Sequence, residues 1–436
     1  MVKAILTSLT MLVTSFYMFP IGIRGIHGHS KMMLAAVGLV LFIINLPRHR
    51  EQGLSKPMAW LSLGALLISF LAVLSVTYNS TPDYAYCSYI ISMWVWVGGA
   101  YAVVCLIRKV HGTASIILIG NYMVAVGVFQ CLTALLFDSY PSIKAFTITY
   151  FDIGHIWLDS VKRVYGFGAN LDTAGARFSS ILVIIVAIIT HISRTRLSRY
   201  IPIYIASFIF ITVVGNIIAR TTTIGLVLAL VFMAYNLTIG YSRERRKKTY
   251  KVAGWVALVG VLGIGITSVY YQSSEVFQEH LRFGFEGFFS LVEKGKWDVA
   301  SNNTLESMYV YPETLKTWLI GDGYFANPHN VDPYYVGKYV EGWYMGTDVG
   351  YLRFIFYFGL PGLLAFSLFI IYAGIFCIKL SPGYKRMFVF LLLVNFAIWF
   401  KVSTDQFMIF ALFLMLNPGE NMDFERRLNG LPPLKQ

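Results

Sequence analysis

Thr347-Asp348-Val349-Gly350-Tyr351-Leu352-Arg353 opens an apolar run that extends to about residue 378, and it places two opposite charges at the mouth of that run. The run is long enough to cross the roughly 30 Å hydrocarbon core of a bilayer. Because charge at a membrane boundary is costly, Asp348 and Arg353 mark a functional-site hypothesis. Residues 273–347, just before them, form one long polar stretch rich in tyrosine. We therefore expect the chemistry in this stretch and in the helix that follows it.

The composition places the rest of the chain in a membrane as well. Of 436 residues, 57% are hydrophobic and only 13% are charged. Apolar runs of about 17–22 residues, each able to cross a bilayer, recur along the sequence. The sequence thus predicts an all-α integral membrane protein with a single polytopic domain over residues 1–436. The twelve expected transmembrane helices cover residues 4–23, 32–46, 58–78, 86–107, 114–137, 178–192, 200–219, 221–240, 252–270, 348–378, 387–401 and 404–417.

The net charge of +13 could suggest a nucleic-acid ligand, but its distribution argues against one. Every second short connection is basic, and the connections between them are not: residues 79–83 contain no Lys or Arg. This alternation follows the positive-inside rule. It predicts that both termini, including the tail 418–436, are cytoplasmic. The basic run 243–251 is also suited to contact with anionic lipid headgroups.

Two connections on the outer side are long, at residues 138–177 and 271–347. In the first, apolar residues at helical spacing within residues 150–159 predict a segment that lies along the membrane surface. The second is too rich in Trp and Tyr for a disordered segment, so we expect it to be folded. A transporter built from two six-span halves often has its long connection on the cytoplasmic side after span six. The placement here is therefore less typical of a transporter.

Four arginines are candidates for binding an anion on the outer side. Arg220 lies between two apolar spans and precedes three threonines, whose hydroxyls and helix N-terminus also favour phosphate. Arg220 could instead be a snorkelling anchor. Arg163 lies in the loop before the sixth span, in a stretch with two glycines at 166 and 168, and Arg177 lies at the entrance of that span. Either arginine could simply be interfacial. Arg353 lies inside the tenth span, and an ion pair with a neighbouring acid is its structural alternative.

Two residues are candidates for a general base, which must lie within hydrogen-bond reach of the hydroxyl that it deprotonates. Asp348 stands at the helix mouth, although an Asp there is also a common helix cap. His329 follows Asn327-Pro328, where it could be only a turn residue. Nearby aromatic residues can stack on sugars but are equally typical of a membrane interface. Because no nucleotide-binding glycine loop or metal-binding spacing is present, neither ligand is expected.

Three motifs together resemble the family of bacterial O-antigen polymerases and O-antigen ligases, which are multispan membrane glycosyltransferases of a GT-C-like type. The first is Arg163-x-x-Gly166 with Asn170 before a span, and the second is Arg220-Thr221-Thr222 between two spans. The third comprises Gly321-x-Gly323, the long loop, and Asp348-Val349-Gly350-Tyr351-Leu352 followed by Gly359 and Gly362. The motifs are short, but the resemblance covers the whole topology.

The resemblance implies undecaprenyl-pyrophosphate-linked oligosaccharides as donor and acceptor, and a reaction that needs no metal or other cofactor. It also implies that external arginines hold the pyrophosphate leaving group while a loop base activates the acceptor hydroxyl. In the ligases that base looks like a histidine in a His-Asn-x-x-Leu arrangement. Counting back from Leu352, the equivalent position here is Asp348. The sequence departs from the ligase pattern at this position, which favours a polymerase.

We therefore expect a polymerase of O-antigen, capsule or exopolysaccharide in the bacterial inner membrane, with its site facing the periplasm. The expected base is Asp348 or His329, and the expected pyrophosphate ligands are Arg163, Arg177, Arg220 and Arg353. The expected partners are the lipid-linked donor and acceptor, membrane lipid and a chain-length-regulating co-polymerase. One alternative is an O-antigen ligase that transfers glycan to lipid A-core. Another is a flippase or other transporter, which the scarcity of charge within the spans disfavours.

Overall fold

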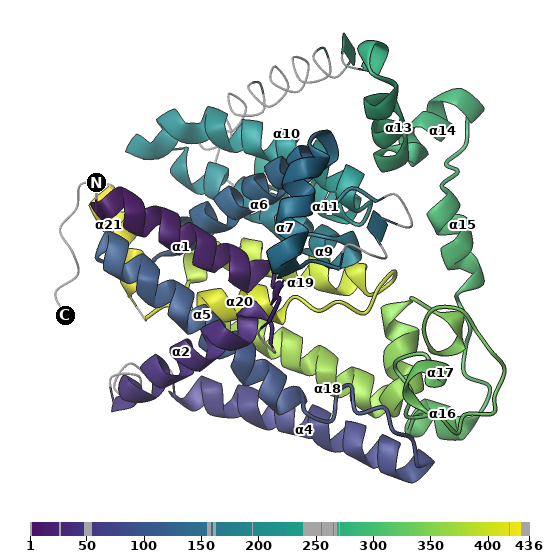
Figure 1. Cartoon of the computed structure of the whole chain (residues 1–436). Coiled ribbons are helices and arrows are strands. Elements are labelled where there is room, and N and C mark those ends of the chain that lie inside the picture. Colours follow the sequence, from purple (N-terminus) through teal and green to yellow (C-terminus); the bar gives the residue numbers. More distant parts are fainter. Residues whose placement is uncertain are drawn as a thin grey trace.

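The computed structural model describes residues 2–25, 28–47, 55–154, 158–159, 163–193, 195–238, 254, 265, 268–269, 271–417 and 419–428. These residues form an almost entirely helical bundle (Figure 1). Six of the described helices are long and apolar enough to cross a membrane, one of them together with the 3₁₀ turn η1 (Arg196–Tyr200) that precedes it. They are α4 (Ser55–Asn79), α5 (Tyr89–His111), α6 (Ile116–Ser139), α9 (Leu171–Ile192), α10 (Ile201–Ile218) and α18 (Gly350–Leu380). The chain is thus an all-α protein suited to a membrane, as its composition predicts.

The remaining expected spans are shorter or fall outside the described residues. Four of them correspond to α1 (Val2–Met18), α2 (Ser30–Ile44), α11 (Thr222–Thr238) and α19 (Lys385–Ile398). The run 404–417 contains only α20 (Phe407–Leu414), which at 1.5 Å per residue is about 12 Å long and is buried throughout. Its apolar side chains fill the bundle core. Apart from isolated positions, the expected span 252–270 lies outside the described residues, so a total of twelve spans stays a prediction.

Helix α9 lies at the centre of the bundle and packs against α6, α10, α11 and α19. Glycines allow α2 and α5 to pack closely against each other. A Cβ at Gly38 of α2 would lie 1.8 Å from the carbonyl oxygen of Gly98 in α5. The start of α1 and the terminal helix α21 (Glu420–Leu428) lie at the same end of the bundle (Figure 1). An ion pair of 2.9 Å between Arg108 and Glu420 holds α21 against the end of α5.

The first long connection is shorter than predicted because α9 begins at Leu171. It contains α7 (Pro141–Tyr150) and the strand β2 (Phe151–Asp152), which pairs antiparallel with β1 (Gly22–Ile23). Within the predicted surface segment 150–159, residues 151 and 152 form the strand β2, and residues 155–157 lie outside the described residues. Ile153 instead packs in a small buried cluster with residues such as Ile21. The pairing of two strands satisfies backbone groups that a surface helix would have satisfied internally.

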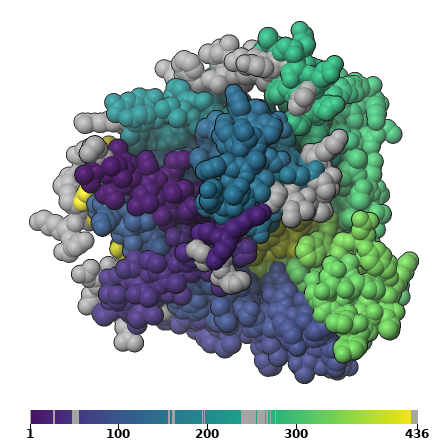
Figure 2. Space-filling view, in the orientation of Figure 1, coloured from purple at the N-terminus to yellow at the C-terminus, as the bar shows by residue number. Residues whose placement is uncertain are grey.

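The second long connection, residues 271–347, lies along one edge of the bundle, away from the start of α1 (Figure 1). It appears as a continuous green rim in Figure 2. Its helices are α13 (Glu275–Gly284), α14 (Glu286–Lys294), α15 (Ala300–Ser307), α16 (Leu315–Leu319) and α17 (Pro328–Val331), followed by the 3₁₀ turn η2 (Tyr344–Gly346). Helix α13 packs on α10, and α16 packs on α18. The segment is thus folded onto the bundle at two places.

Helix α18 is broken near its start, at Phe358 (φ −138°, ψ 21°) and Gly359 (φ 72°, ψ −178°). Pro361 follows and has no N–H for the carbonyl oxygen of Tyr357. That oxygen accepts hydrogen bonds from Gly323 N (3.2 Å) and from the Ser75 hydroxyl (2.7 Å). Residues 360–380 alone are about 30 Å long as a helix. The buried segment that carries Arg353 is therefore a separate piece before a full-length span.

A second contact at this break ties residues 321–326 to the bundle. The N–H of Asp322 donates to the carbonyl oxygen of Phe356 at 2.5 Å. Asp83, shortly after the C-terminal end of α4, accepts hydrogen bonds from the backbone N–H groups of Phe325 and Ala326, each at 2.7 Å. Gly321 has a φ of 85°, and a Cβ there would lie 2.5 Å from the Tyr357 carbonyl oxygen. The Gly321-x-Gly323 motif thus has a structural role at the break in α18.

We predict that Gly359→Ala lowers stability more than Gly295→Ala does. Both glycines have positive φ, but a Cβ at Gly359 would lie 2.6 Å from the Leu319 backbone, whereas Gly295 has open space. The backbone conformation of Gly359 is also one that essentially only Gly adopts, at a cost of about 1–3 kcal/mol for other residues. Thermal midpoints of the two purified variants in detergent measure the difference. Equal losses would contradict a close packing of α18 against the end of α16.

Candidate functional site

A cavity of about 950 Å³ lies between the bundle and residues 271–347. Its walls come from the start of α9, the turn after α10, helices α13 and α15, the turn at α17, the start of α18 and the residues after α19. Four of the six predicted site residues line it together: Arg163, Arg220, Asp348 and Arg353. They are distant in sequence, and the fold brings them to one space.

Arg220 and Arg163 share one aromatic ring. The guanidinium carbon of Arg220 lies 3.9 Å from the centre of the Phe283 ring, and that of Arg163 lies 4.3 Å from it. Arg220 also forms a 2.7 Å ion pair with Glu286 and donates to Ser301 at 3.0 Å. Burial lowers the pKa of Arg220; Glu286 opposes this effect, whereas the charge of Arg163 adds to it. Two mutually repelling cations at one ring favour a bound anion.

Arg353 lies between two aromatic rings, with its guanidinium carbon 3.8 Å from the centres of both Phe325 and Trp343. It donates to the Ser403 hydroxyl at 2.8 Å and to the Phe325 carbonyl oxygen at 3.1 Å. The residue is only 6% exposed, and its Nε has no hydrogen-bond partner in the part of the chain described. Among those same residues no carboxylate lies within 4.0 Å of it. The ion pair considered as its structural alternative is therefore not formed with any described residue.

The carboxylate of Asp348 faces the same cavity and has neither an ion pair nor a hydrogen bond with any described residue. It does not cap α18, because Val349 holds the N-cap position and the cap has no side-chain hydrogen bond. Burial raises the pKa of Asp348 above its ordinary value, and Asp172 adds to this, whereas Arg353 and Lys401 lower it. A partly buried carboxylate without partners suits a proton acceptor.

Lys401 and Asp172 join the two sides of the cavity and were not expected from the sequence. Lys401 Nζ lies 3.1 Å from Asp172 Oδ1 and donates to the Thr221 hydroxyl at 3.1 Å. Thr221 in turn donates to Asp172. Lys401 could have been found by the signal that singled out Arg220, a basic residue at the end of an apolar run. Nothing in the sequence pattern distinguishes Asp172 from an ordinary acid in a helix's first turn.

The threonines after Arg220 do not offer free groups to a phosphate. The Thr222 hydroxyl donates to Gly215 O at 3.0 Å, and the Thr223 hydroxyl donates to Asn216 Oδ1 at 2.6 Å. The first backbone N–H groups of α11 also have partners in the turn or on α9. The hydroxyl and N–H groups expected to bind an anion at this helix N-terminus thus already have partners within the protein. Of the groups in this motif, the Arg220 side chain is the one that lines the cavity with its charge.

His329 and Arg177 lie outside the residues that line the cavity. His329 is exposed on α17, where its ring packs against Tyr335 and Tyr339 at centroid distances of 5.0 and 5.3 Å. Arg177 lies within the bundle over the ring of Phe19 at 5.3 Å. The structure therefore separates these two from the other four predicted residues.

The cavity is lined by two cations, Arg163 and Arg353, that have no carboxylate partner among the described residues. It is also lined by a carboxylate, Asp348, that has no basic partner among them. Arginine is well suited to phosphate because its planar group forms two parallel hydrogen bonds. The arrangement can therefore hold an anionic group and accept a proton beside it. The sequence matches no protein-family model and no curated protein.

We predict that Asp348→Asn is at least as stable as the wild type at neutral pH. A raised pKa means that protonation of Asp348 favours folding, and that this contribution is lost as the pH rises through the folded-state pKa. Asn is neutral at every pH, so its advantage should shrink as the pH is lowered. Thermal midpoints across a pH series measure it.

Asp83→Asn is the matched control, since Asp83 is buried and its carboxylate accepts hydrogen bonds from the backbone N–H groups of Ala85, Phe325 and Ala326. It should cost about 1–3 kcal/mol. A lowered midpoint for Asp348→Asn at neutral pH would contradict the interpretation that burial of the charge dominates at this position.

Proposed function

We propose that this protein is a polysaccharide polymerase that joins lipid-pyrophosphate-linked oligosaccharide units on the outer side of a bacterial inner membrane. The growing glycan, on its undecaprenyl pyrophosphate, is transferred to a sugar hydroxyl of the next lipid-linked unit. The observation that carries the proposal is the shared cavity, in which Asp348 lies with Arg163, Arg220 and Arg353. This combination provides both functions that such a transfer requires, anion binding and proton removal.

In the proposed reaction the acceptor hydroxyl oxygen attacks the anomeric carbon of the donor sugar, and a new carbon–oxygen bond forms. The bond between that carbon and the pyrophosphate oxygen breaks, and its electron pair leaves with the pyrophosphate. Asp348 takes the proton of the acceptor hydroxyl. The arginines stabilise negative charge as it develops on the leaving group. Attack opposite to the leaving group would invert the configuration at the anomeric carbon.

The geometry favours Asp348 over His329 as the base. Asp348 faces the cavity, whereas the ring of His329 packs among exposed tyrosines. Arg353 is a pyrophosphate ligand in this proposal because its buried charge lacks a carboxylate partner in the described part of the chain. Arg177 is not included, since its guanidinium lies within the bundle. A ligase acting on lipid A-core and a flippase remain as outcomes of the test below.

We predict that purified protein in detergent converts a synthetic undecaprenyl-pyrophosphate repeat unit into a ladder of longer glycans without added metal or nucleotide. Arg220→Ala should slow chain extension by about 10²–10³-fold, because a preorganised charge is lost from the leaving group. Asp348→Asn should slow it by about 10²–10⁴-fold. Products separated by size give the rates.

Arg282→Ala and Asp298→Asn are the matched controls. Both residues lie in the same outer segment, are paired with their own partners and do not line the cavity. They and His329→Ala should extend chains at the wild-type rate. Transfer only to lipid A-core would replace the polymerase with a ligase. Movement of the lipid across vesicles without any glycosyl transfer would overturn the enzymatic proposal.

The rate of chain extension should fall in acid with an apparent pKa above the ordinary value of aspartate. The base must be ionised, and burial raises the pKa of Asp348, so activity is lost as the pH falls through this raised value. With Asp348→Glu, the rate of chain extension should still fall in acid, but at a different pH. Initial rates between acid and neutral pH test this. A rate independent of pH down to the ordinary aspartate range would exclude Asp348 as the base.

A further inference from the structure

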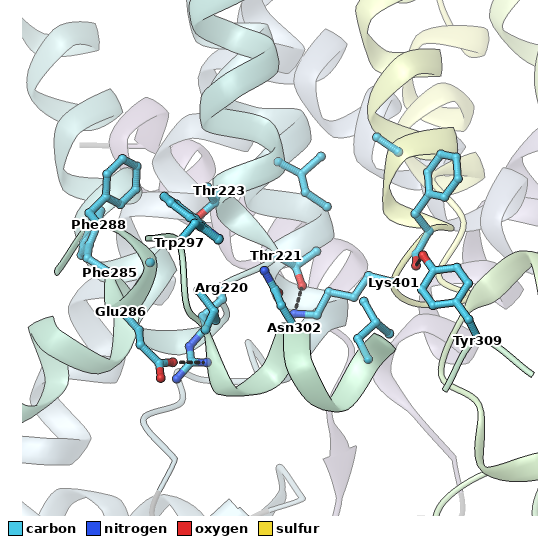
Figure 3. Close-up of a pocket in the computed structure, with 17 residues that line it drawn as sticks. Arg220, Thr221, Thr223, Phe285, Glu286, Phe288, Trp297, Asn302, Tyr309 and Lys401 are labelled. Atoms are coloured by element: carbon cyan, nitrogen blue, oxygen red, sulfur yellow. Dashed lines mark hydrogen bonds and ion pairs between the residues drawn. The ribbon is translucent and has the colours of Figure 1, made fainter. Parts of the chain in front are cut away.

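A second, smaller cavity of about 310 Å³ lies beside Arg220 (Figure 3). It shares Arg220, Leu305 and Lys401 with the larger cavity, so the two adjoin at the charged wall. Most of its remaining wall is apolar or aromatic, formed by Ile224, Phe285, Phe288, Trp297, Val299, Ala397 and Phe400. A pocket of this kind suits an apolar group attached to an anion that lies in the neighbouring space.

The polar side chains of this pocket offer a sugar little: apart from the Asn302 amide, they already have partners among the described residues. The hydroxyls of Thr221 and Thr223 already donate to Asp172 and Asn216, and the Tyr309 hydroxyl donates to Phe400 O at 2.9 Å. Glu286 is paired with Arg220, as the dashed line in Figure 3 shows. A buried sugar would need partners for several hydroxyl groups, and leaving them unpaired is costly. A hydrocarbon chain needs none.

The apolar walls continue along the outside of two packed helices. Ile224, Val227 and Val231 fall on one face of α11 at spacings of three and four residues, and the latter two are half-exposed. On α19, Ala397, Leu393 and Val389 follow one another at spacings of four residues, and Leu393 and Val389 are exposed. Helices α11 and α19 pack against each other. The pocket is thus the outer end of two exposed apolar stripes that run toward the membrane interior.

We propose that this pocket binds the first part of the hydrocarbon chain of a phosphorylated lipid, whose phosphate or pyrophosphate lies in the larger cavity beside Arg220 and Arg163. The chain would continue between the exposed faces of α11 and α19 into the bilayer. Arg163 lines the larger cavity, has no carboxylate partner among the described residues and shares the Phe283 ring with Arg220. This uncompensated positive charge beside the shared wall places the anionic end of the lipid. The inference rests on the proposed function, because it assigns the lipid part of the same substrate.

Binding to full-length protein in nanodiscs, corrected with empty nanodiscs, tests this assignment. The probes are farnesyl pyrophosphate, dodecyl phosphate, farnesol and inorganic pyrophosphate. Farnesyl pyrophosphate should bind the wild type at least about tenfold more tightly than inorganic pyrophosphate, because its chain is buried as well. Dodecyl phosphate tests whether a saturated chain on a single phosphate is also bound, and either result supports a lipid pocket. Equal affinities for farnesyl pyrophosphate and inorganic pyrophosphate would overturn it.

Ala397→Trp places a large side chain in the pocket. It should lower the affinity for farnesyl pyrophosphate to that for inorganic pyrophosphate and leave the affinity for inorganic pyrophosphate unchanged. Trp297→Ala, at a half-exposed wall residue whose loss should not prevent folding, should reduce the same difference in affinity. Leu364→Trp, at an exposed position of α18 outside the pocket, is the matched control and should change neither affinity.

Arg220→Ala distinguishes the chain pocket from the anion site. It should weaken both pyrophosphate ligands and leave farnesol unaffected. If the wild type binds inorganic pyrophosphate but Ala397→Trp retains the full chain advantage, the lipid pocket fails while the proposed function stands. If the wild type binds neither pyrophosphate ligand, both proposals fail. Farnesol binding as tightly as farnesyl pyrophosphate would overturn the link between the pocket and Arg220.

Discussion

Pro361 has no N–H, so α18 leaves the carbonyl oxygen of Tyr357 without its usual helical partner, and Ser75 and the backbone of Gly323 supply donors instead. This exchange of hydrogen bonds connects α18, the C-terminal end of α4 and the long segment 271–347 at one point. Through it the Phe325 ring is held against Arg353. The buried position of Arg353, and with it one end of the cavity, depends on the break in α18 at Phe358 and Gly359.

Charge compensation inside the cavity is uneven, and this is its most informative property. Arg220 is paired with Glu286, and Lys401 with Asp172, so these pairs are satisfied without a ligand. Aromatic rings and neutral oxygens are the partners of Arg353 within the described residues, and such partners compensate a buried charge less well than a carboxylate does. Arg163 likewise relies on the ring of Phe283. A cavity with this deficit gains most from an anion, which is the physical basis of the proposed pyrophosphate site.

Much of the site was predictable where the signal was charge at the end of an apolar run. That signal identified Arg220, Asp348 and Arg353, and it would also have identified Lys401, whereas Arg163 was found in a glycine-containing loop before a span. The signal does not separate Arg177 from these residues, because a charge near a helix start can point into the bundle as easily as into a cavity. It failed for the threonines after Arg220, whose hydroxyls are used within the turn. Hydropathy also predicted a helix longer than α20, because a short buried core helix and a membrane span can have the same apolar composition.

The sequence by itself determined the all-α, membrane-suited class of this protein, because hydrophobic content and run length depend only on the order of residues. It also determined that charge collects at the ends of apolar runs and in the connections between them. Only the tertiary structure decided which of those charges meet, since residues 163, 220, 348 and 353 come together through helix packing and a broken helix. It also decided that Asp348 faces a cavity while His329 does not. Side-chain direction depends on the packing of distant segments, which no local pattern contains.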